Sequence, residues 1–411
     1  MLDFNNYPTP PTSPACNICC TSRQKWSKGR PPPTETTGKT IVDSDSNIKC
    51  SIQPAFATAS KQARCGPLSP GGRLGRLLEG KLQLTEILGT GAYGVVYLAV
   101  DTESGIRYAV KCLSKFSATG KSLGRRQIAR QQREVRLHYL ASAHPNVVSI
   151  VKVLDEFDGI YVVLEYCPEG DLFLNISQFG KYIGNDGLCK KVFVQLLDAV
   201  GHCHKLGIYH RDLKPENVLV TNHGQTMKLA DFGLATSDDR SEDYGCGSTF
   251  YMSPECLEPS TRKSCYYMCA PNDVWSLGVI LVNLIFGCNP WRLASSQDQT
   301  YRAYARSRDT LKKILPLTDE LNDILIEIFN PNPDLRITLP ELRDRIMACT
   351  KFTAPAMATV ALPTQPSSLS CITGYVSNED ATVEGCGYES LSPVSISSND
   401  GSLTSRAATI D

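Results

Sequence analysis

The fold of this chain is decided by one stretch, His210-Arg211-Asp212-Leu213-Lys214-Pro215-Glu216-Asn217. Apolar residues at helical spacing precede it, from Val192 to His204, and they predict a helix that ends shortly before it. The residues that follow, Val218-Leu219-Val220, are β-branched and apolar and predict a strand. A second strand then leads to Asp231-Phe232-Gly233. The stretch is therefore a loop between a helix and a short β-hairpin.

Two carboxylates and one amide lie on the loops that flank this hairpin: Asp212, Asn217 and Asp231. Mg²⁺ prefers oxygen ligands, and it usually takes one or two protein carboxylates together with phosphate oxygens. Asn217 and Asp231 fit this donor set, which leaves Asp212 free to orient a hydroxyl group and accept its proton. The residues therefore predict a magnesium-dependent site that acts on a hydroxyl.

The composition limits the class of protein. The 411 residues carry 42 basic and 42 acidic side chains, so nothing in the overall charge points to nucleic acid as a partner. The first residues, Met1 to Pro14, are polar and proline-rich, and no apolar run reaches the roughly 18 residues that a membrane span needs. We therefore expect no signal peptide and no membrane association. The 17 cysteines are scattered, which favours free thiols in a cytoplasmic or nuclear protein.

The two ends of the chain differ in composition from its middle. Residues 1–80 and 348–411 are rich in Pro, Ser, Thr and Gly and lack hydrophobic periodicity, so we expect both to be disordered tails. The pattern Cys16-x-x-Cys19-Cys20 in the first tail is half of a zinc-binding motif. No second Cys/His pair with zinc spacing follows, so free tail thiols are the favoured interpretation.

A glycine-rich loop opens the middle region, Gly89-Thr90-Gly91-Ala92-Tyr93-Gly94-Val95-Val96. The same glycine spacing occurs in dinucleotide-binding folds, where it opens a helix. Here the residues after it are β-branched and aromatic and predict a strand, as do Leu82, Leu84 and Ile87 before it. A glycine hairpin between two strands lets backbone N–H groups approach a phosphate closely.

These motifs together resemble those of the protein kinase family. The octapeptide matches H-R-D-L-x-x-x-N, D-F-G follows it, and Tyr108-Ala109-Val110-Lys111 resembles the V-A-I-K strand. Lys214, two residues after the aspartate, is typical of the Ser/Thr kinases. The resemblance covers about Lys81 to Ile346 and implies an α+β, bilobal fold. It implies an N-lobe with an antiparallel sheet and one helix (81–164), a hinge (165–170) and a mostly helical C-lobe (171–347).

The resemblance also implies a site for ATP and Mg²⁺. Lys111 would contact the α- and β-phosphates and pair with Glu134, which lies in a helix predicted over 122–142. Asp212 would align the acceptor hydroxyl and Lys214 would neutralise the γ-phosphate, with Asn217 and Asp231 as metal ligands. The residues implied for ATP are Leu88, Gly89, Gly91, Gly94, Val96, Ala109, Lys111, Glu165, Cys167, Asp171 and Leu219.

The hinge is expected to bind the adenine ring, and the role of Asp171, the residue that follows the hinge, has two interpretations. Backbone groups of Glu165 and Cys167 would bind the adenine edge, with Leu164 behind them. Asp171 resembles the position that meets ribose or a basic substrate residue, and with Glu216 it suggests Arg or Lys upstream of the acceptor. Asp171 is equally suited to cap the helix that follows it.

The segment after Asp231 is expected to present the protein substrate. Cys246-Gly247-Ser248 resembles the loop beside the acceptor residue, and Ser253-Pro254-Glu255 the family's A-P-E element. Arg211 normally pairs with a phosphorylated residue, and the spacing places Tyr244 at that position. Glu242 and Asp243 precede it. We hypothesise that these acids supply part of the negative charge, so that no upstream kinase is needed.

Three further residues have expected roles in support of the site. Asp273 would brace the backbone of His210 and Arg211, and Arg336 would pair with Glu255. His138, one helical turn after Glu134, is expected to be a core histidine near Phe232 rather than a catalytic one.

Several segments outside the predicted ATP and metal site resemble fungal Ser/Thr kinases of the Ran/Pat type. This group includes negative regulators of meiosis and nutrient-responsive relatives. The segments are Gly245 to Glu255, Asn289-Pro290-Trp291-Arg292 and Leu315-Pro316-Leu317. We therefore expect a monomeric kinase of Ser/Thr-bearing proteins, in growth, nutrient or meiotic control. Two other functions compete, a pseudokinase scaffold and a small-molecule phosphotransferase. The first usually lacks Lys111 or one of the two aspartates, and the second usually lacks the Ser-Pro-Glu element and the acceptor loop.

Overall fold

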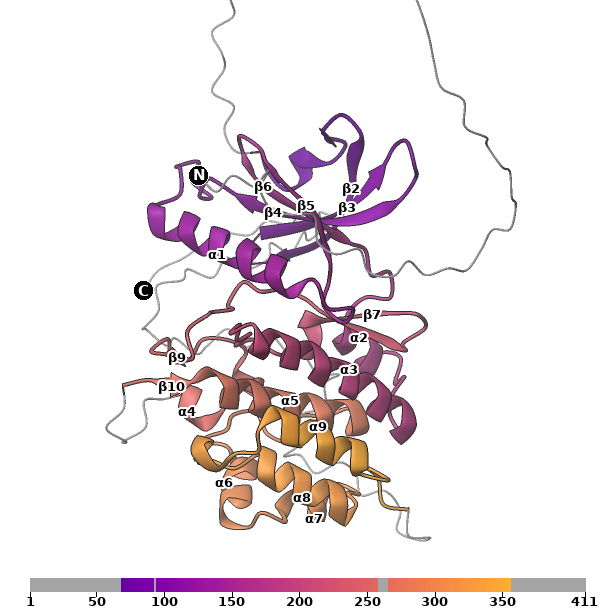
Figure 1. The fold of residues 1–411 in the computed structure, drawn as a ribbon, viewed down its shortest axis with the longest axis vertical. Helices are drawn as coiled ribbons and strands as arrows, with labels where there is room; N and C mark the ends of the chain where they lie inside the picture. The colour runs from indigo at the N-terminus through magenta and orange to yellow at the C-terminus, as the bar shows by residue number, and fades with distance from the viewer. Residues whose placement is uncertain (1–67, 92–93, 258–264, 356–411) are drawn as a thin grey trace, which may run out of the picture. The chain divides into compact units, whose positions relative to one another are not determined.

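The computed structural model describes residues 68–91, 94–257 and 265–355 of the chain. Within these ranges an antiparallel sheet with one long helix comes first, and a mainly helical region follows it (Figure 1). The expected α+β, bilobal fold is confirmed. The cysteines of the first tail, Cys16, Cys19 and Cys20, lie outside the described residues.

The N-lobe sheet has six strands in the spatial order β1-β2-β3-β4-β6-β5. Side chains alternate between its two faces. Val110 and Cys112 therefore pack into one core cluster with Tyr97, while Leu113 packs on the other face against the helix. Lys111 shares the helix-facing side with Leu113. The strands are β1 (Leu77–Leu78), β2 (Leu82–Gly91), β3 (Gly94–Asp101), β4 (Arg107–Ser114), β5 (Ile150–Asp155) and β6 (Gly159–Glu165).

The helix on that face is α1 (Arg125–Ala141), which lies inside the range predicted for it. Its buried residues recur at helical spacing and include Glu134, Val135 and His138. The helix therefore turns one carboxylate and one imidazole toward the interior, together with its apolar side chains.

The C-lobe is built around α5 (Cys269–Phe286). This helix is long and apolar enough to cross a membrane, but 83% of it is buried inside the lobe, as expected for a core helix. Its packing is close, because a Cβ on Gly278 would lie 2.3 Å from the Ile328 side chain. The other helices are α2 (Leu172–Ser177), α3 (Asp186–Lys205), α4 (Pro254–Leu257), α6 (Gln299–Arg306), α7 (Thr310–Ile314), α8 (Asp319–Ile328) and α9 (Leu339–Ala348).

The opening octapeptide lies where the sequence predicted it. It follows α3, ends in a short 3₁₀ helix (Pro215–Asn217), and leads into the hairpin of β7 (Val218–Thr221) and β8 (Thr226–Leu229). A second two-stranded sheet pairs β9 (Arg240–Ser241) with β10 (Tyr267–Met268).

The structure corrects both predicted domain boundaries. Residues 68–80 were expected to be disordered, yet they include a 3₁₀ helix (Gly71–Arg73) and β1, which pairs with β2. At the other end the ordered chain continues beyond residue 347, because Phe352 is 1% exposed. Composition does not reveal this order, because a few buried residues such as Leu78 and Phe352 fix segments that are otherwise polar. The rest of each predicted tail lies outside the described residues.

Candidate active site

A cavity of about 700 Å³ lies between the sheet, α1 and the β7–β8 hairpin. We call it the cleft. It is lined by every residue predicted to bind ATP or metal, by Glu134 and by Lys214. Asp212 is the one predicted site residue that does not line it. Segments far apart in the sequence therefore meet at one place.

Three charged side chains that line the cleft contact one another. Lys111 Nζ lies 2.6 Å from Glu134 Oε1 and 2.7 Å from Asp231 Oδ1. Burial alone would lower the pKa of Lys111, but the two carboxylates outweigh it and raise this pKa above its usual value. For Asp231 the effects are reversed: burial alone would raise its pKa, but the charge of Lys111 outweighs burial and holds this pKa below its usual range. The site therefore holds one fixed cation beside an ionised carboxylate.

The glycine loop closes one side of the cleft. Gly94 has φ of +149°, and a Cβ there would lie 2.4 Å from the backbone oxygen of Cys112, so only glycine fits. A Cβ on Gly89 or Gly91 would meet nothing within 4 Å. These two glycines leave the backbone accessible from the cleft.

The hinge presents backbone rather than side chains to the cleft. The Glu165 carboxylate is occupied by Lys228 Nζ at 2.8 Å and by the Ser149 N–H at 2.7 Å. Its own N–H donates to the Ser149 carbonyl at 3.0 Å. Cys167 is 7% exposed, and burial raises the pKa of its thiol to about 12, so the thiol is neutral at physiological pH.

Asp171 caps a helix, as one of the two predictions for it required. Its carboxylate accepts the Leu174 N–H at 2.7 Å at the start of α2. It also lines the cleft, so capping does not remove it from the site.

A hydrogen-bonded group around Asp212 joins the cleft through Lys214 and Asn217, which line it. Lys214 Nζ lies 2.9 Å from one carboxylate oxygen, and the Ser248 hydroxyl donates to the other at 2.9 Å. Lys214 also donates to the Ser248 oxygen at 2.7 Å. Asn217 donates through Nδ2 to the Asp212 backbone oxygen at 2.8 Å, which directs the amide group and leaves its oxygen as the acceptor. The expected placement of Ser248 beside the catalytic loop is therefore observed.

The backbone of the octapeptide His210–Asn217, which we call the catalytic loop, is held in place by Asp273 of α5. Asp273 accepts the N–H groups of His210 and Arg211, each at 2.9 Å, as the sequence predicted. His204 Nε2 also lies 2.9 Å from the Asp273 carboxylate. The sequence did not reveal this third contact, because a histidine in the last turn of an amphipathic helix has many ordinary roles.

His138 is a core histidine, as predicted. Its Nε2 lies 2.8 Å from the Val148 backbone oxygen, and its ring stacks on Phe232 with centroids 4.8 Å apart. Burial lowers its pKa to about 4, so the ring is neutral at physiological pH.

Arg211 is held by residues of the segment from Asp231 to Glu255, which we call the activation segment. Its Nη1 lies 3.1 Å from Asp243 Oδ2 and donates to the Ser241 hydroxyl at 2.7 Å. The guanidinium also donates through Nε to the Leu234 backbone oxygen. Tyr244, which the spacing placed here, packs instead on Tyr267 with ring centroids 5.8 Å apart. The carboxylate nearest Arg211 is therefore that of Asp243.

The end of this segment is fixed to the C-lobe. Arg336 makes two bonds to the Glu255 carboxylate, of 2.6 and 3.0 Å, and its guanidinium lies over Trp275. This predicted pair is buried, with the Arg336 side chain 0% exposed.

The donor set fits Mg²⁺. Asn217 offers an amide oxygen and Asp231 an ionised carboxylate, and both line the cleft. Asp231 has φ of +58°, a strained conformation for a non-glycine residue that is often found at functional sites. In the part of the chain that the structure describes, no three His, Cys, Asp or Glu side chains could hold a metal unaided. A bound ion would therefore take further ligands from phosphate oxygens and water.

A comparison with known protein families gives the same class of protein as the geometry of the site. Residues 82–346 match the protein kinase domain, and the chain belongs to the protein kinase family, whose members use ATP.

Among its relatives, the "Negative regulator of sexual conjugation and meiosis" of Schizosaccharomyces pombe is 49% identical over 298 residues, covering 68% of this chain and 62% of that protein. The serine/threonine-protein kinases SKS1 and VHS1 of Saccharomyces cerevisiae are 32% and 31% identical, over 66% and 76% of this chain and 65% and 78% of their own lengths. The chain thus spans less than two thirds of the first two relatives. The resemblance to fungal Ran/Pat-type kinases is confirmed.

Proposed function

We propose that this chain is a serine/threonine protein kinase that transfers the γ-phosphate of Mg-ATP to Ser or Thr hydroxyls of proteins. One observation carries the proposal. The fixed cation Lys111 and the ionised Asp231 line one cleft, and the Lys214 amine that pairs with Asp212 lines the same cleft. Phosphoryl transfer needs little covalent help from a protein and depends mainly on positioning and charge neutralisation.

Each residue then has one task. Lys111, held by Glu134, binds the α- and β-phosphates. Asp212 orients the incoming hydroxyl and accepts its proton, and Lys214 neutralises charge on the phosphate as it is transferred. When bound, Mg²⁺ supplies charge neutralisation at the phosphates, and Asn217 and Asp231 are the residues that would hold it.

We further propose a preference for substrates with Arg or Lys upstream of the acceptor. Asp171 and Glu216 are acidic residues that both line the cleft. Opposite charges at such positions act mainly on specificity and rate of encounter. A peptide array would show this preference as signal that disappears when the upstream basic residues are replaced by alanine.

An assay of the purified chain tests the main proposal. With Mg-ATP and a generic basic protein, we expect phosphate on Ser and Thr of the protein, and none with an Asp212→Asn variant. Nucleotide binding without transfer would favour the pseudokinase scaffold. Transfer only to small molecules would favour the small-molecule phosphotransferase.

The biological role is a separate proposal, because the relatives extend beyond the matched region. We propose that the chain acts in fungal growth, nutrient or meiotic control, as a monomer in the cytoplasm or nucleus. Expression in fission yeast that lacks the meiosis regulator would test it. Restored repression of meiosis by the chain, but not by its Asp231→Asn variant, is the expected result.

A further inference from the structure

A short segment before the matched kinase domain crosses the N-lobe sheet. We call residues 69–78 the N-terminal strap. Its backbone is fixed to β2, because the Gly75 N–H donates to the Leu84 carbonyl at 2.7 Å and the Leu84 N–H donates to the Arg76 carbonyl at 3.0 Å. The Tyr97 hydroxyl donates to the Pro70 carbonyl at 3.0 Å. The strap is therefore part of the folded lobe, although the family match begins only at residue 82.

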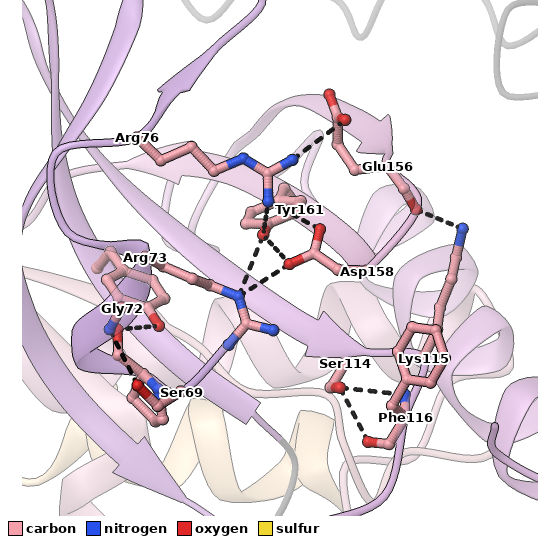
Figure 2. Close-up of polar contacts among 12 residues, drawn as sticks. Ser69, Gly72, Arg73, Arg76, Ser114, Lys115, Phe116, Glu156, Asp158 and Tyr161 are labelled. Carbon is pink, nitrogen blue, oxygen red and sulfur yellow. Dashed lines mark hydrogen bonds and ion pairs between the residues drawn. The ribbon is translucent and has the colours of Figure 1, made fainter. Parts of the chain in front are cut away.

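Two arginines of the strap enter a polar cluster beneath it (Figure 2). Arg73 is 4% exposed, and its Nε donates to Asp158 at 3.1 Å and to the Tyr161 hydroxyl at 3.2 Å. Arg76 Nη1 donates to the other Asp158 oxygen at 2.8 Å and to the same hydroxyl at 2.9 Å. Tyr161 in turn donates to Asp158 at 2.9 Å. The two guanidinium groups thus clamp one carboxylate from two sides.

That carboxylate belongs to the turn between β5 and β6. Arg76 Nη2 also contacts Glu156 of this turn at 3.3 Å. Burial alone would raise the pKa of Asp158, but hydrogen bonds from Arg76, Tyr161 and Arg73 hold this pKa below its usual range, so the clamp stays charged. The turn is therefore held to the strap by charge as well as by packing.

The same turn holds Lys115, the residue that follows the last residue of β4. The Lys115 N–H donates to the Asp158 carbonyl at 3.1 Å, and Lys115 Nζ donates to the Glu156 carbonyl at 2.6 Å (Figure 2). A Cβ on Gly159 would lie 2.9 Å from the Leu113 carbonyl, so the turn packs directly on β4. The position of the turn therefore sets the position of the end of β4.

The end of β4 is bonded in turn to α1. The Leu123 N–H, just before the helix, donates to the Lys115 carbonyl at 2.9 Å, and Gln131 Nε2 donates to the Ser114 carbonyl at 2.9 Å. Gln131 lies one turn before Glu134 on the helix, and Lys111 lies on β4 itself. The contacts of the strap thus lead to the two elements that bring Lys111 and Glu134 together.

We propose that Arg73 and Arg76 are positioning residues for phosphoryl transfer, which act by clamping the β5–β6 turn and so fixing β4 against α1 at the Lys111–Glu134 pair. The inference rests on the proposed function. A buried ion pair is weak evidence for a stabilising role, because apolar residues of similar size often replace one without loss. Defined placement of the turn is the role that the geometry supports.

The test uses the full chain with Arg73→Met and Arg76→Met together, which keep the side-chain stems and remove both charges. We expect the KM for ATP to rise and kcat to fall, with kcat/KM for ATP lower by about tenfold. Misplacement of a positioned group by about 1 Å costs up to about a hundredfold. The KM for the protein substrate should not change. The matched control is Lys152→Met, which removes an ion pair to Glu79 on the same sheet but lies off the path to α1. Its kinetics should equal those of the wild type.

A second measurement tests the proposal even if the double variant does not fold. Asp158→Asn keeps the volume of the central side chain and removes its charge, and faster amide hydrogen exchange in α1 than in the Lys152→Met control is then expected. Unchanged kinetics in the double variant, or unchanged exchange in Asp158→Asn, would overturn the proposal. If the wild type transfers no phosphate, the proposed function fails. Affinity for an ATP analogue and exchange in α1 would still test the strap.

Discussion

Two parts of the site, which we call the nucleotide end (Lys111, Glu134 and Asp231) and the substrate end (Asp212, Lys214 and the activation-segment residues that contact the catalytic loop), are held by different kinds of contact. At the nucleotide end, Lys111 and Glu134 form a charge pair whose side chains are 13% and 7% exposed. At the substrate end, Ser248 is hydrogen-bonded to Asp212 and Lys214, and Arg211 pairs with Asp243, whose side chain is 64% exposed. The nucleotide end is largely shielded from solvent, and the substrate end depends on the activation segment.

This difference indicates where the kinase is open to control. Charge pairs that are shielded from water are screened little by salt. An exposed carboxylate is screened more and contributes less, and the activation segment that carries it can be reached by other proteins. Changes at the nucleotide end should therefore remove activity outright, while changes to the activation-segment residues that contact Asp212 and Arg211 should adjust it.

The largest effect is expected at the nucleotide end. Asp231→Asn removes the carboxylate that would hold Mg²⁺ and that pairs with Lys111, so turnover should fall by about a thousandfold or more. The fold should remain intact, since asparagine has nearly the same volume. Phosphate transfer and the thermal midpoint of unfolding would be measured together. Asp344→Asn, at an exposed position on α9, is the control and should leave both unchanged. Substantial turnover in Asp231→Asn would refute the metal assignment.

A smaller effect is expected from Ser248→Ala at the substrate end. The variant loses the hydroxyl that joins Asp212 to Lys214, so kcat should fall by about tenfold to a hundredfold, less than the roughly 10²–10⁴-fold that a general acid or base itself contributes. The KM for ATP should change little, because the hydroxyl contacts neither Lys111 nor Asp231. Ser248→Thr restores a hydroxyl and should recover most of the activity. If Ser248→Thr stays as inactive as Ser248→Ala, the hydroxyl is not the reason for the loss.

A still smaller effect is expected from Asp243→Asn. The variant removes the charge beside Arg211 but leaves the Ser241 contact, so activity should fall by about threefold to tenfold, in line with the modest value of a partly exposed ion pair. Phosphatase treatment of the purified wild type should leave its activity unchanged. Asp239→Asn, in the same segment and 3.8 Å from Arg240, is the matched control. Loss of wild-type activity on phosphatase treatment would instead show that a phosphate is required.

The Lys111–Glu134 pair and the residues that line the cleft could be predicted from the sequence, and the contacts at the substrate end only in part. Motifs such as His210 to Asn217 fix residue types at set spacings, because the chemistry allows few alternatives. The choice between Asp243 and Tyr244 at Arg211 depends on how a loop turns, and Gly245, with φ of +66°, contributes to that turn. Arg73 was missed for another reason. Its partner Asp158 lies 85 residues away, and no local pattern signals such a pairing.

The smallest effect on turnover is expected from His138, which lies behind the nucleotide end. An unfolded histidine has a pKa of about 6.5, while burial lowers that of His138 to about 4, with Lys111 and His210 lowering it further and Val148 O and Asp231 opposing them. Between these values the unfolded chain binds a proton that the folded chain does not, so the free energy of unfolding falls as the pH falls. The loss across this window is about 3 kcal/mol. His138→Gln cannot titrate, so its unfolding free energy should depend less on pH by that amount, while turnover at pH 7 changes little. Denaturant unfolding of both proteins between pH 7 and pH 4.5 would measure this, and parallel curves would show that the imidazole is not the titrating group.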